Sequence, residues 1–198
     1  ELEQEDTRRT ELLETSSMAR AKRAVLDRDL AMWLGNDVEC AADSSIRFSP
    51  GSLDIEALTE GLAIVLMAAA GSDQRAPYAA RRALAKELQA PGWRARTLGG
   101  AWIAPRKGEI MVCRDPGEAA KVSTTDPRFE GVWDGRFLIS RAGNTRVSNQ
   151  IWRSGDPATP MARDTMPRGL SSTQIAENLV KARLSMTKYL LEQDALTL

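Results

Sequence analysis

Histidine is absent from all 198 residues of the chain. Without an imidazole, every mechanism that uses His as base, acid or metal ligand is excluded, including Ser-His-Asp and Cys-His nucleophiles and two-His zinc sites. Cysteine is scarce: Cys40 and Cys113 are the only two, too few for a four-cysteine zinc site or a disulfide framework. We therefore expect reduced thiols and a cytoplasmic location.

Two patterns that often mark a function are also missing. Neither a G-x-x-x-x-G-K-[ST] nor a G-x-G-x-x-G phosphate-binding loop occurs. The richest apolar run, Gly61–Gly71, is too short to cross a membrane and predicts one buried helix, so we expect no membrane partner. The chain opens without methionine, basic n-region or apolar h-region, which predicts no signal peptide, and we interpret it as part of a longer protein.

Charge is balanced overall but unevenly distributed, with 27 Lys and Arg against 27 Asp and Glu. Residues 1–74 hold 7 basic and 15 acidic side chains, residues 75–141 hold 13 and 7, and residues 142–198 hold 7 and 5. A basic block can mark a face that binds a large anion such as nucleic acid. Alternatively, the acidic and basic blocks neutralise each other across an internal interface, and the sequence leaves both interpretations open.

Three helices are predicted before Pro91. Apolar residues recurring three or four apart indicate a helix over Thr10–Leu34 and a second over Ile55–Ala69, which Gly71 closes. A proline suited to the first turn opens a third helix over Pro77–Leu88.

After Pro91 the sequence becomes typical of a small antiparallel sheet. Short apolar runs on either side of a Pro-Arg-Lys-Gly turn predict a hairpin within Trp93–Arg114. Val132–Ser140 is a further strand candidate, in which Asp134-Gly135 is either a tight turn or a bulge. Val147–Trp152 is a candidate for one more strand.

A closing helix is predicted over Ser172–Glu192, because Ser171 and Gln174 match a capping box. Its expected apolar seam consists of Ile175, Leu179, Ala182, Met186 and Tyr189. Together the elements predict an α+β fold in which helices cover one face of the sheet. The expected parts are an N-terminal helical domain over residues 1–90, a small β-rich segment over 91–170 and a C-terminal amphipathic helix over 171–198.

The basic block also supplies candidate RNA-binding residues. Lys and Arg beside a turn or on an exposed helical face can reach a phosphate and keep their hydration. By this criterion the first candidates are Arg81 and Arg82 on the third helix and Arg106 and Lys107 at the hairpin turn. The second candidates are Arg94, Arg96 and Arg136, because the sequence does not determine which face of a strand they occupy. Trp93, Trp102 and Trp133 lie among them and either stack on bases or, the preferred interpretation, fill a small β core. No pattern of catalytic or metal-binding residues is found.

Two segments of the basic block resemble a known family. Arg96–Pro116, RTLGGAWIAPRKGEIMVCRDP, is similar to the segment after the helical domain of bacterial tRNA(Ile)-lysidine synthetases of the alphaproteobacterial type, where a TLGG stretch leads through a short turn to a strand ending in a CRE-like tripeptide. Val132–Phe137, VWDGRF, resembles a motif further downstream in the same proteins, and Pro77-Tyr78 with the arginines that follow resembles the preceding helix. The resemblance covers residues 75–140, roughly a third of the 198 residues.

The resemblance implies a specific function. The family ligates lysine to the wobble cytidine of a minor isoleucine tRNA and uses ATP to adenylate the base before the amine attacks. Catalysis, with ATP and magnesium, belongs to an N-terminal ATP-pyrophosphatase domain with an SGGxDS loop, which this sequence lacks. The chain is then a tRNA-binding, non-catalytic part of the ligase that holds no cofactor itself, has tRNA and the missing catalytic domain as partners, and is inactive alone.

A function of a different class stays open beside it. In this alternative the acidic helices and the basic block of residues 75–141 neutralise each other, and the C-terminal seam docks a partner helix. The chain is then a protein interaction module with no RNA role. This alternative predicts little affinity for RNA and a stable dimer or hetero-complex.

Overall fold

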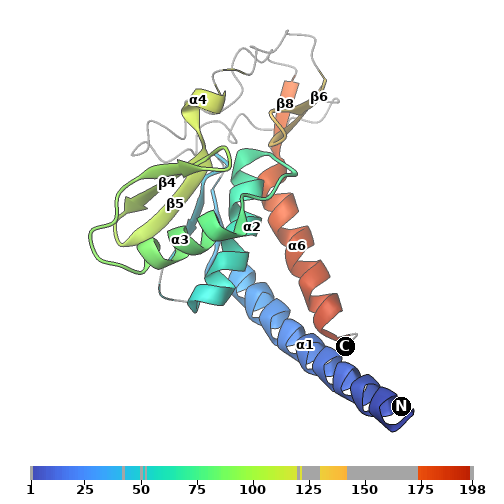
Figure 1. Ribbon diagram of the computed structural model, residues 1–198. Helices are drawn as coiled ribbons and strands as arrows, with labels where there is room; N and C mark the ends of the chain where they lie inside the picture. Colours follow the sequence, from blue (N-terminus) through green and yellow to red (C-terminus); the bar gives the residue numbers. More distant parts are fainter. Residues whose placement is uncertain are drawn as a thin grey trace.

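The computed structural model describes residues 2–41, 43–49, 51, 53–119, 121, 130–141 and 174–196. Helices and antiparallel strands mix along the chain (Figure 1), so the predicted α+β class is confirmed. The helices are α1 (Leu2–Asn36), α2 (Ile55–Ala70), α3 (Tyr78–Leu88), α4 (Pro116–Ala119) and α6 (Leu179–Leu196). The strands are β1 (Glu39–Cys40), β2 (Ile46–Phe48), β3 (Arg96–Leu98), β4 (Ala101–Arg106), β5 (Glu109–Arg114), β6 (Gly131–Trp133), β7 (Phe137–Arg141) and β8 (Gln174–Asn178).

The larger sheet has five antiparallel strands in the order β1-β2-β5-β4-β3. β4 and β5 form the predicted hairpin, and its turn residues Lys107 and Gly108 both have positive φ (49° and 87°). β2 pairs with β5 in a register that places Ile46 opposite Val112. Strands from the first 90 residues and from the β-rich segment therefore share one sheet.

The smaller sheet has the order β6-β7-β8. Trp133 is paired with Phe137, and the Arg136 N–H donates to the Trp133 carbonyl (3.1 Å). This bond closes a turn with Asp134 and Gly135 at its centre, both at positive φ (49° and 63°), so this dipeptide is a tight turn and not a bulge. The predicted strand at Val147–Trp152 lies outside the described residues.

One hydrophobic core joins the helices to the larger sheet. α2 lies between this sheet and α6 (Figure 1). Trp33 of α1 packs edge-on against Phe48 of β2, with ring centroids 5.2 Å apart. The same indole fills the space beside Gly61 of α2, where a Cβ would come within 2.8 Å of a ring carbon. A glycine inside α2 thus allows α1 to pack closely against it.

The bounds of α2 lie close to the predicted Ile55–Ala69, and local signals set them. The Asp54 carboxylate accepts the Ala57 N–H (2.8 Å) at the start, and Gly71 adopts the left-handed conformation (φ 62°) just past the end. α3 starts at Tyr78, one residue after the predicted start at Pro77, and ends at the predicted Leu88. α1 is longer than the predicted Thr10–Leu34, and Figure 1 shows its N-terminal part projecting from the rest of the molecule.

The closing helix begins later than predicted. Gln174–Asn178 is strand β8, paired with β7. The Asn178 Oδ1 accepts the Val180 N–H (2.9 Å) and so caps α6. The predicted capping box at Gln174 and the helix start at Ser172 are therefore wrong, because pairing with β7 overrides the local pattern.

The buried face of α6 also differs from the predicted seam. Val180, Leu184 and Leu191 are buried, whereas Met186 and Tyr189 of the seam are 60% and 55% exposed. The buried residues lie four and seven apart and the seam residues three or four apart, and both sets of spacings place their members along one helix face. Periodicity alone cannot decide which of two such stripes faces the core.

Candidate nucleic-acid interface

A cluster of charged side chains is buried where β5, the β6–β7 turn and the end of α2 meet. The Arg136 guanidinium, with 0% exposure, donates two hydrogen bonds to Asp134 Oδ2 (3.0 and 2.7 Å) and one to Ser44 Oγ (3.1 Å). Arg114 pairs with Asp134 Oδ1 (2.9 Å) and donates to the Ala70 carbonyl (2.6 Å). We call Ser44, Arg114, Asp134 and Arg136 the arginine joint.

Two glycines bring backbones into contact at this joint. Gly71 after α2 and Gly135 in the β6–β7 turn are both left-handed (φ 62° and 63°). A Cβ on Gly71 would collide with the Asp134 carbonyl, and one on Gly135 with the Gly71 carbonyl. The close approach, together with the Arg114 bond to α2, fixes the smaller sheet against the end of α2.

Burial controls protonation around the joint. Loss of hydration lowers the pKa of Arg136, and the Asp134 carboxylate opposes this shift. The guanidinium still stays charged at neutral pH because its ordinary pKa is so high. Burial raises the pKa of the Cys113 thiol to about 12 and that of Cys40 to about 11. Both thiols are neutral at physiological pH, which makes them poor nucleophiles and poor metal ligands.

The segments Arg96–Pro116 and Val132–Phe137 converge on the arginine joint. The Gly100 carbonyl of the TLGG turn accepts the Asp115 N–H (3.0 Å) at the end of the CRD stretch. The preceding Arg114 pairs with Asp134 of VWDGRF. A Cβ on Gly100 would stand 3.1 Å from Arg114 Nη1, so the glycine keeps room for this arginine. These motif residues form a buried support, not an exposed contact surface.

Two of the predicted RNA-binding residues are buried. Arg81 is 5% exposed, donates to the carbonyls of Ala76 (3.0 Å) and Thr59 (2.6 Å), and pairs with Glu60 (3.3 Å). Arg136 belongs to the arginine joint. The expectation that Arg81 reaches outward is wrong, because its guanidinium satisfies backbone carbonyls inside the fold. Neither side chain can meet a phosphate without giving up these bonds.

Three predicted residues do face solvent: Arg82 on α3, Arg94 before β3 and Lys107 at the β4–β5 turn. They belong to residues 75–109, which we call the basic segment and which holds eight Lys or Arg against two Asp or Glu. Its exposed cations are Arg75, Arg82, Lys86, Arg94, Arg96 and Lys107.

The two remaining predicted residues are engaged with neighbours. Arg96 is exposed and forms an ion pair with Glu87 of α3. Arg106 is half-buried, and its guanidinium donates to the Met111 sulfur (3.5 Å). Both can contribute to a positive field, but their side chains are less available for a phosphate than those of Arg82, Arg94 and Lys107.

The three tryptophans of the β region differ in burial. Trp133 is buried and packs against Phe137 with ring centroids 6.0 Å apart, which confirms the core interpretation for this ring. Trp93 is partly buried against the core. Trp102 on β4 is also only partly buried, so part of its surface meets solvent.

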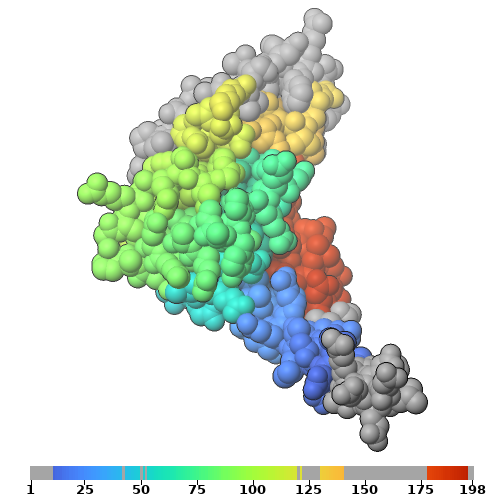
Figure 2. All heavy atoms as spheres, viewed as in Figure 1, coloured from blue at the N-terminus to red at the C-terminus, as the bar shows by residue number. Residues whose placement is uncertain are grey.

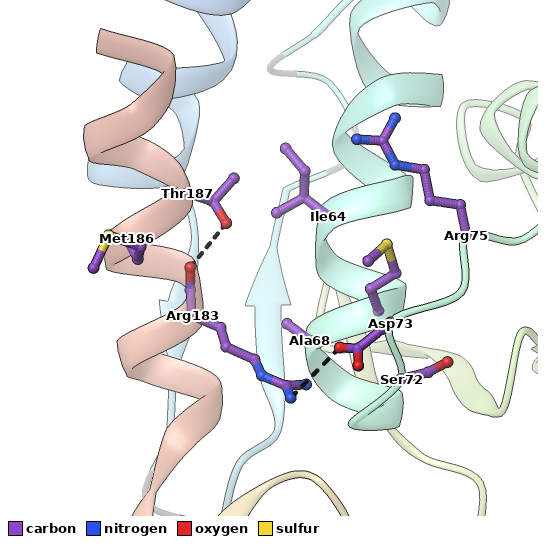
Figure 3. Close-up of a pocket in the computed structure, with 9 residues that line it drawn as sticks. Ile64, Ala68, Ser72, Asp73, Arg75, Arg183, Met186 and Thr187 are labelled. Carbon is purple, nitrogen blue, oxygen red and sulfur yellow. Dashed lines mark hydrogen bonds and ion pairs between the residues drawn. The ribbon is translucent and has the colours of Figure 1, made fainter. Parts of the chain in front are cut away.

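A cleft of about 300 Å³ lies between α2 and α6. Ile64 and Ala68 form part of its apolar wall. In Figure 3, Arg183 points toward Asp73, 3.8 Å from its carboxylate. Arg75 lines the same cleft from beyond the end of α2. Sequence reasoning did not select Arg75 or Arg183, since only their positive charge marks them.

Among the described residues, no group of three or more Cys, Asp or Glu side chains is placed to hold a metal ion. None of the helices in the described ranges is long and apolar enough to cross a membrane. Comparison of the chain with models of known protein families, with curated proteins and with solved structures finds no match. The candidate site therefore depends on its geometry and charge.

Proposed function

We propose that this chain is the tRNA-binding, non-catalytic part of a tRNA(Ile)-lysidine synthetase, the ligase that joins lysine to the wobble cytidine of a minor isoleucine tRNA. The observation that supports RNA binding most strongly is the set of exposed cations on the basic segment. Affinity for nucleic acid comes largely from Lys and Arg that neutralise backbone phosphates, and these cations meet that requirement.

The two acidic residues of the basic segment do not cancel its charge. Glu87 pairs with Arg96, and Glu109 lies opposite Arg106 in the β4–β5 register. Arg82, Lys86, Arg94 and Lys107 form no ion pair with any residue in the described ranges and are exposed. Figure 2 shows the green and yellow-green atoms of α3, β4 and β5 gathered on one flank of the molecule. A polyanion can approach these elements from solvent.

The family resemblance and the exposed cations support different parts of the proposal. The resemblance is the reason to propose tRNA(Ile) as the RNA. The segments that carry the resemblance also contain residues of the arginine joint, which holds the smaller sheet on α2. The cations supply contact with the backbone of that RNA. Recognition by such contacts positions an RNA without reading its bases, so sequence selectivity is left to the parent enzyme as a whole.

No step of the ligation is assigned to this chain. It has no phosphate-binding loop, its two thiols are held neutral by burial, and the described residues contain no cluster fit to bind magnesium. ATP and magnesium belong, by resemblance, to the N-terminal domain. A lysine-incorporation assay with ATP and the cognate tRNA should give no turnover with this chain alone; turnover would show that an active site lies within these residues.

Binding of a labelled tRNA(Ile) transcript, followed by fluorescence anisotropy, tests the RNA role. The variant R82A/R94A/K107A should bind more weakly than the unmodified chain. The matched control R20A/K121A/K181A removes three exposed cations outside the basic segment and should bind almost as well as the unmodified chain. Equal losses in both variants, or no binding by the unmodified chain, would contradict the proposal.

A further inference from the structure

Helix α1 carries an apolar stripe on the side away from the core. Met18, Val25 and Met32 are 67%, 54% and 52% exposed and follow one another at intervals of seven residues, so they line up along one face. Leu30 and Leu34 of the same helix are buried on the core side. Of ten large hydrophobic side chains that are exposed among the described residues, eight lie on α1 and α6.

Such exposed apolar side chains, grouped on one element, mark an interaction surface. The charges beside the stripe indicate what would cover it. Glu14 lies one turn before Met18, and Arg28 lies nearly one turn after Val25, on the same side of the stripe. Both side chains are exposed. One helix thus offers an anion at one end of the apolar stretch and a cation at the other.

We propose that α1 pairs antiparallel with α1 of a second copy of this chain, about a two-fold axis at Ala21. In an antiparallel pair related by two-fold symmetry, side chains on the same side of each helix meet across the contact. Met18 then packs against Val25 of the second copy, and Glu14 forms an ion pair with Arg28 of the second copy. The symmetry repeats both contacts, and the small side chain of Ala21 allows a close approach at the axis.

The rest of α1 is compatible with this arrangement. Lys22 lies near the axis on the other side of the stripe, where it would approach Lys22 of the second copy. Its ammonium group instead pairs with Glu56 of α2 (3.0 Å), which holds it away from the axis. The core lies on the side of α1 that carries the buried Leu30 and Leu34, away from the stripe. Figure 1 shows the N-terminal part of α1 extending beyond the end of α6.

The second copy fits this face better than a nucleic acid does. Glu11 and Glu14 precede Met18 at the outer end of the described side chains, and their charge repels phosphate. The same sequence supplies both members of the Glu14 and Arg28 pair, so no other molecule is needed to complement it. Pairing over one helix buries a modest area, and we expect a weak dimer that forms with rising concentration.

Sedimentation equilibrium of the full chain over a concentration series tests the proposal. The apparent mass should rise from 21.7 kDa toward twice that value. Met18→Lys should abolish this rise. Glu14→Arg and Arg28→Glu should each weaken dimerisation by roughly two- to thirtyfold, because each removes two exposed ion pairs. The double variant E14R/R28E restores both pairs with reversed sign and should recover the association of the unmodified chain.

Arg20→Glu is the matched control, since Arg20 is exposed on the same helix away from the stripe, and it should leave dimerisation unchanged. Circular dichroism should show equal helix content in all variants, because every changed side chain is exposed. A chain that stays monomeric over the whole series would overturn the proposal, and so would a double variant no better than the single ones. Binding of tRNA by M18K should match that of the unmodified chain, which separates this test from that of the proposed RNA role.

Discussion

Neighbouring arginines can have opposite roles, and the local sequence does not distinguish them. Arg81 and Arg82 follow each other on α3, yet Arg81 is buried against backbone carbonyls of Thr59 and Ala76 while Arg82 faces solvent. The burial of Arg81 depends on Thr59 of α2, which lies 22 residues earlier in the chain. Charge and helical spacing could therefore nominate both arginines for RNA binding but could not separate them.

Arg136 should matter for stability far more than for contact with RNA. Arg136→Met leaves the buried Asp134 without two of its hydrogen bonds and should lower the free energy of unfolding by about 3–5 kcal/mol. Arg136→Lys should recover little, because an ammonium cannot make the forked contact. Urea denaturation measures both effects, and Arg82→Met, at an exposed site, should change stability by about 0.5 kcal/mol or less. A stable R136M protein with weakened tRNA binding would show instead that Arg136 meets the RNA.

Cys113 should make stability fall at alkaline pH. Its pKa is near 9.0 when unperturbed and is raised by burial to about 12 in the fold. The folded state therefore keeps a proton that the unfolded state loses, so the stabilisation is complete below pH 9 and is lost as pH rises toward 12. Above pH 9, urea denaturation of the unmodified chain should show a steeper decline with pH than that of Cys113→Ala, by up to about 1.4 kcal/mol per pH unit. Parallel declines would show that the thiol does not titrate differently on folding.

At the scale of elements, predictions succeed where the deciding signals are local. Asp54 and Gly71 cap α2 within its own segment, and the turn before Glu109 forms the β4–β5 hairpin from adjacent residues. The predicted start of α6 is wrong because Gln174–Asn178 pairs with β7 as a strand. This pairing cannot be inferred from the residues around Gln174. The predicted apolar seam of α6 is wrong for a related reason, because the face of α6 that is buried depends on its packing against α1 and α2.

The glycine contact between α2 and the β6–β7 turn should be far less tolerant than an ordinary positive-φ glycine. Gly135→Ala places a Cβ against the Gly71 carbonyl as well as straining the backbone, so it should cost about 3 kcal/mol or more and weaken attachment of the smaller sheet. Gly108→Ala is the matched control, since Gly108 also has positive φ (87°) but nothing lies within 4 Å of a Cβ there. It should cost about 1–2 kcal/mol from backbone strain alone. Equal losses of stability in the two variants would show that the close approach at the joint is unimportant.

At the scale of the whole molecule, the chain combines a buried charged joint with an exposed basic segment. The sequence correctly indicated the α+β class and several exposed cations. It could not show that Arg114, Asp134 and Ser44 meet at Arg136, because these residues come from three separate parts of the chain. Nor could it show that Arg75 and Arg183 line one cleft, since their proximity depends on how α6 packs against α2.

The most direct test of the central claim is the salt dependence of tRNA binding by the full chain and by R82A/R94A/K107A. If these three exposed side chains contact phosphates, the slope of log affinity against log salt should become shallower by about 2 to 2.7, since each lost contact removes roughly 0.7 to 0.9. The control R20A/K121A/K181A should keep the slope of the unmodified chain. An unchanged slope and affinity in the R82A/R94A/K107A variant would contradict the claim that the basic segment is the RNA-binding surface.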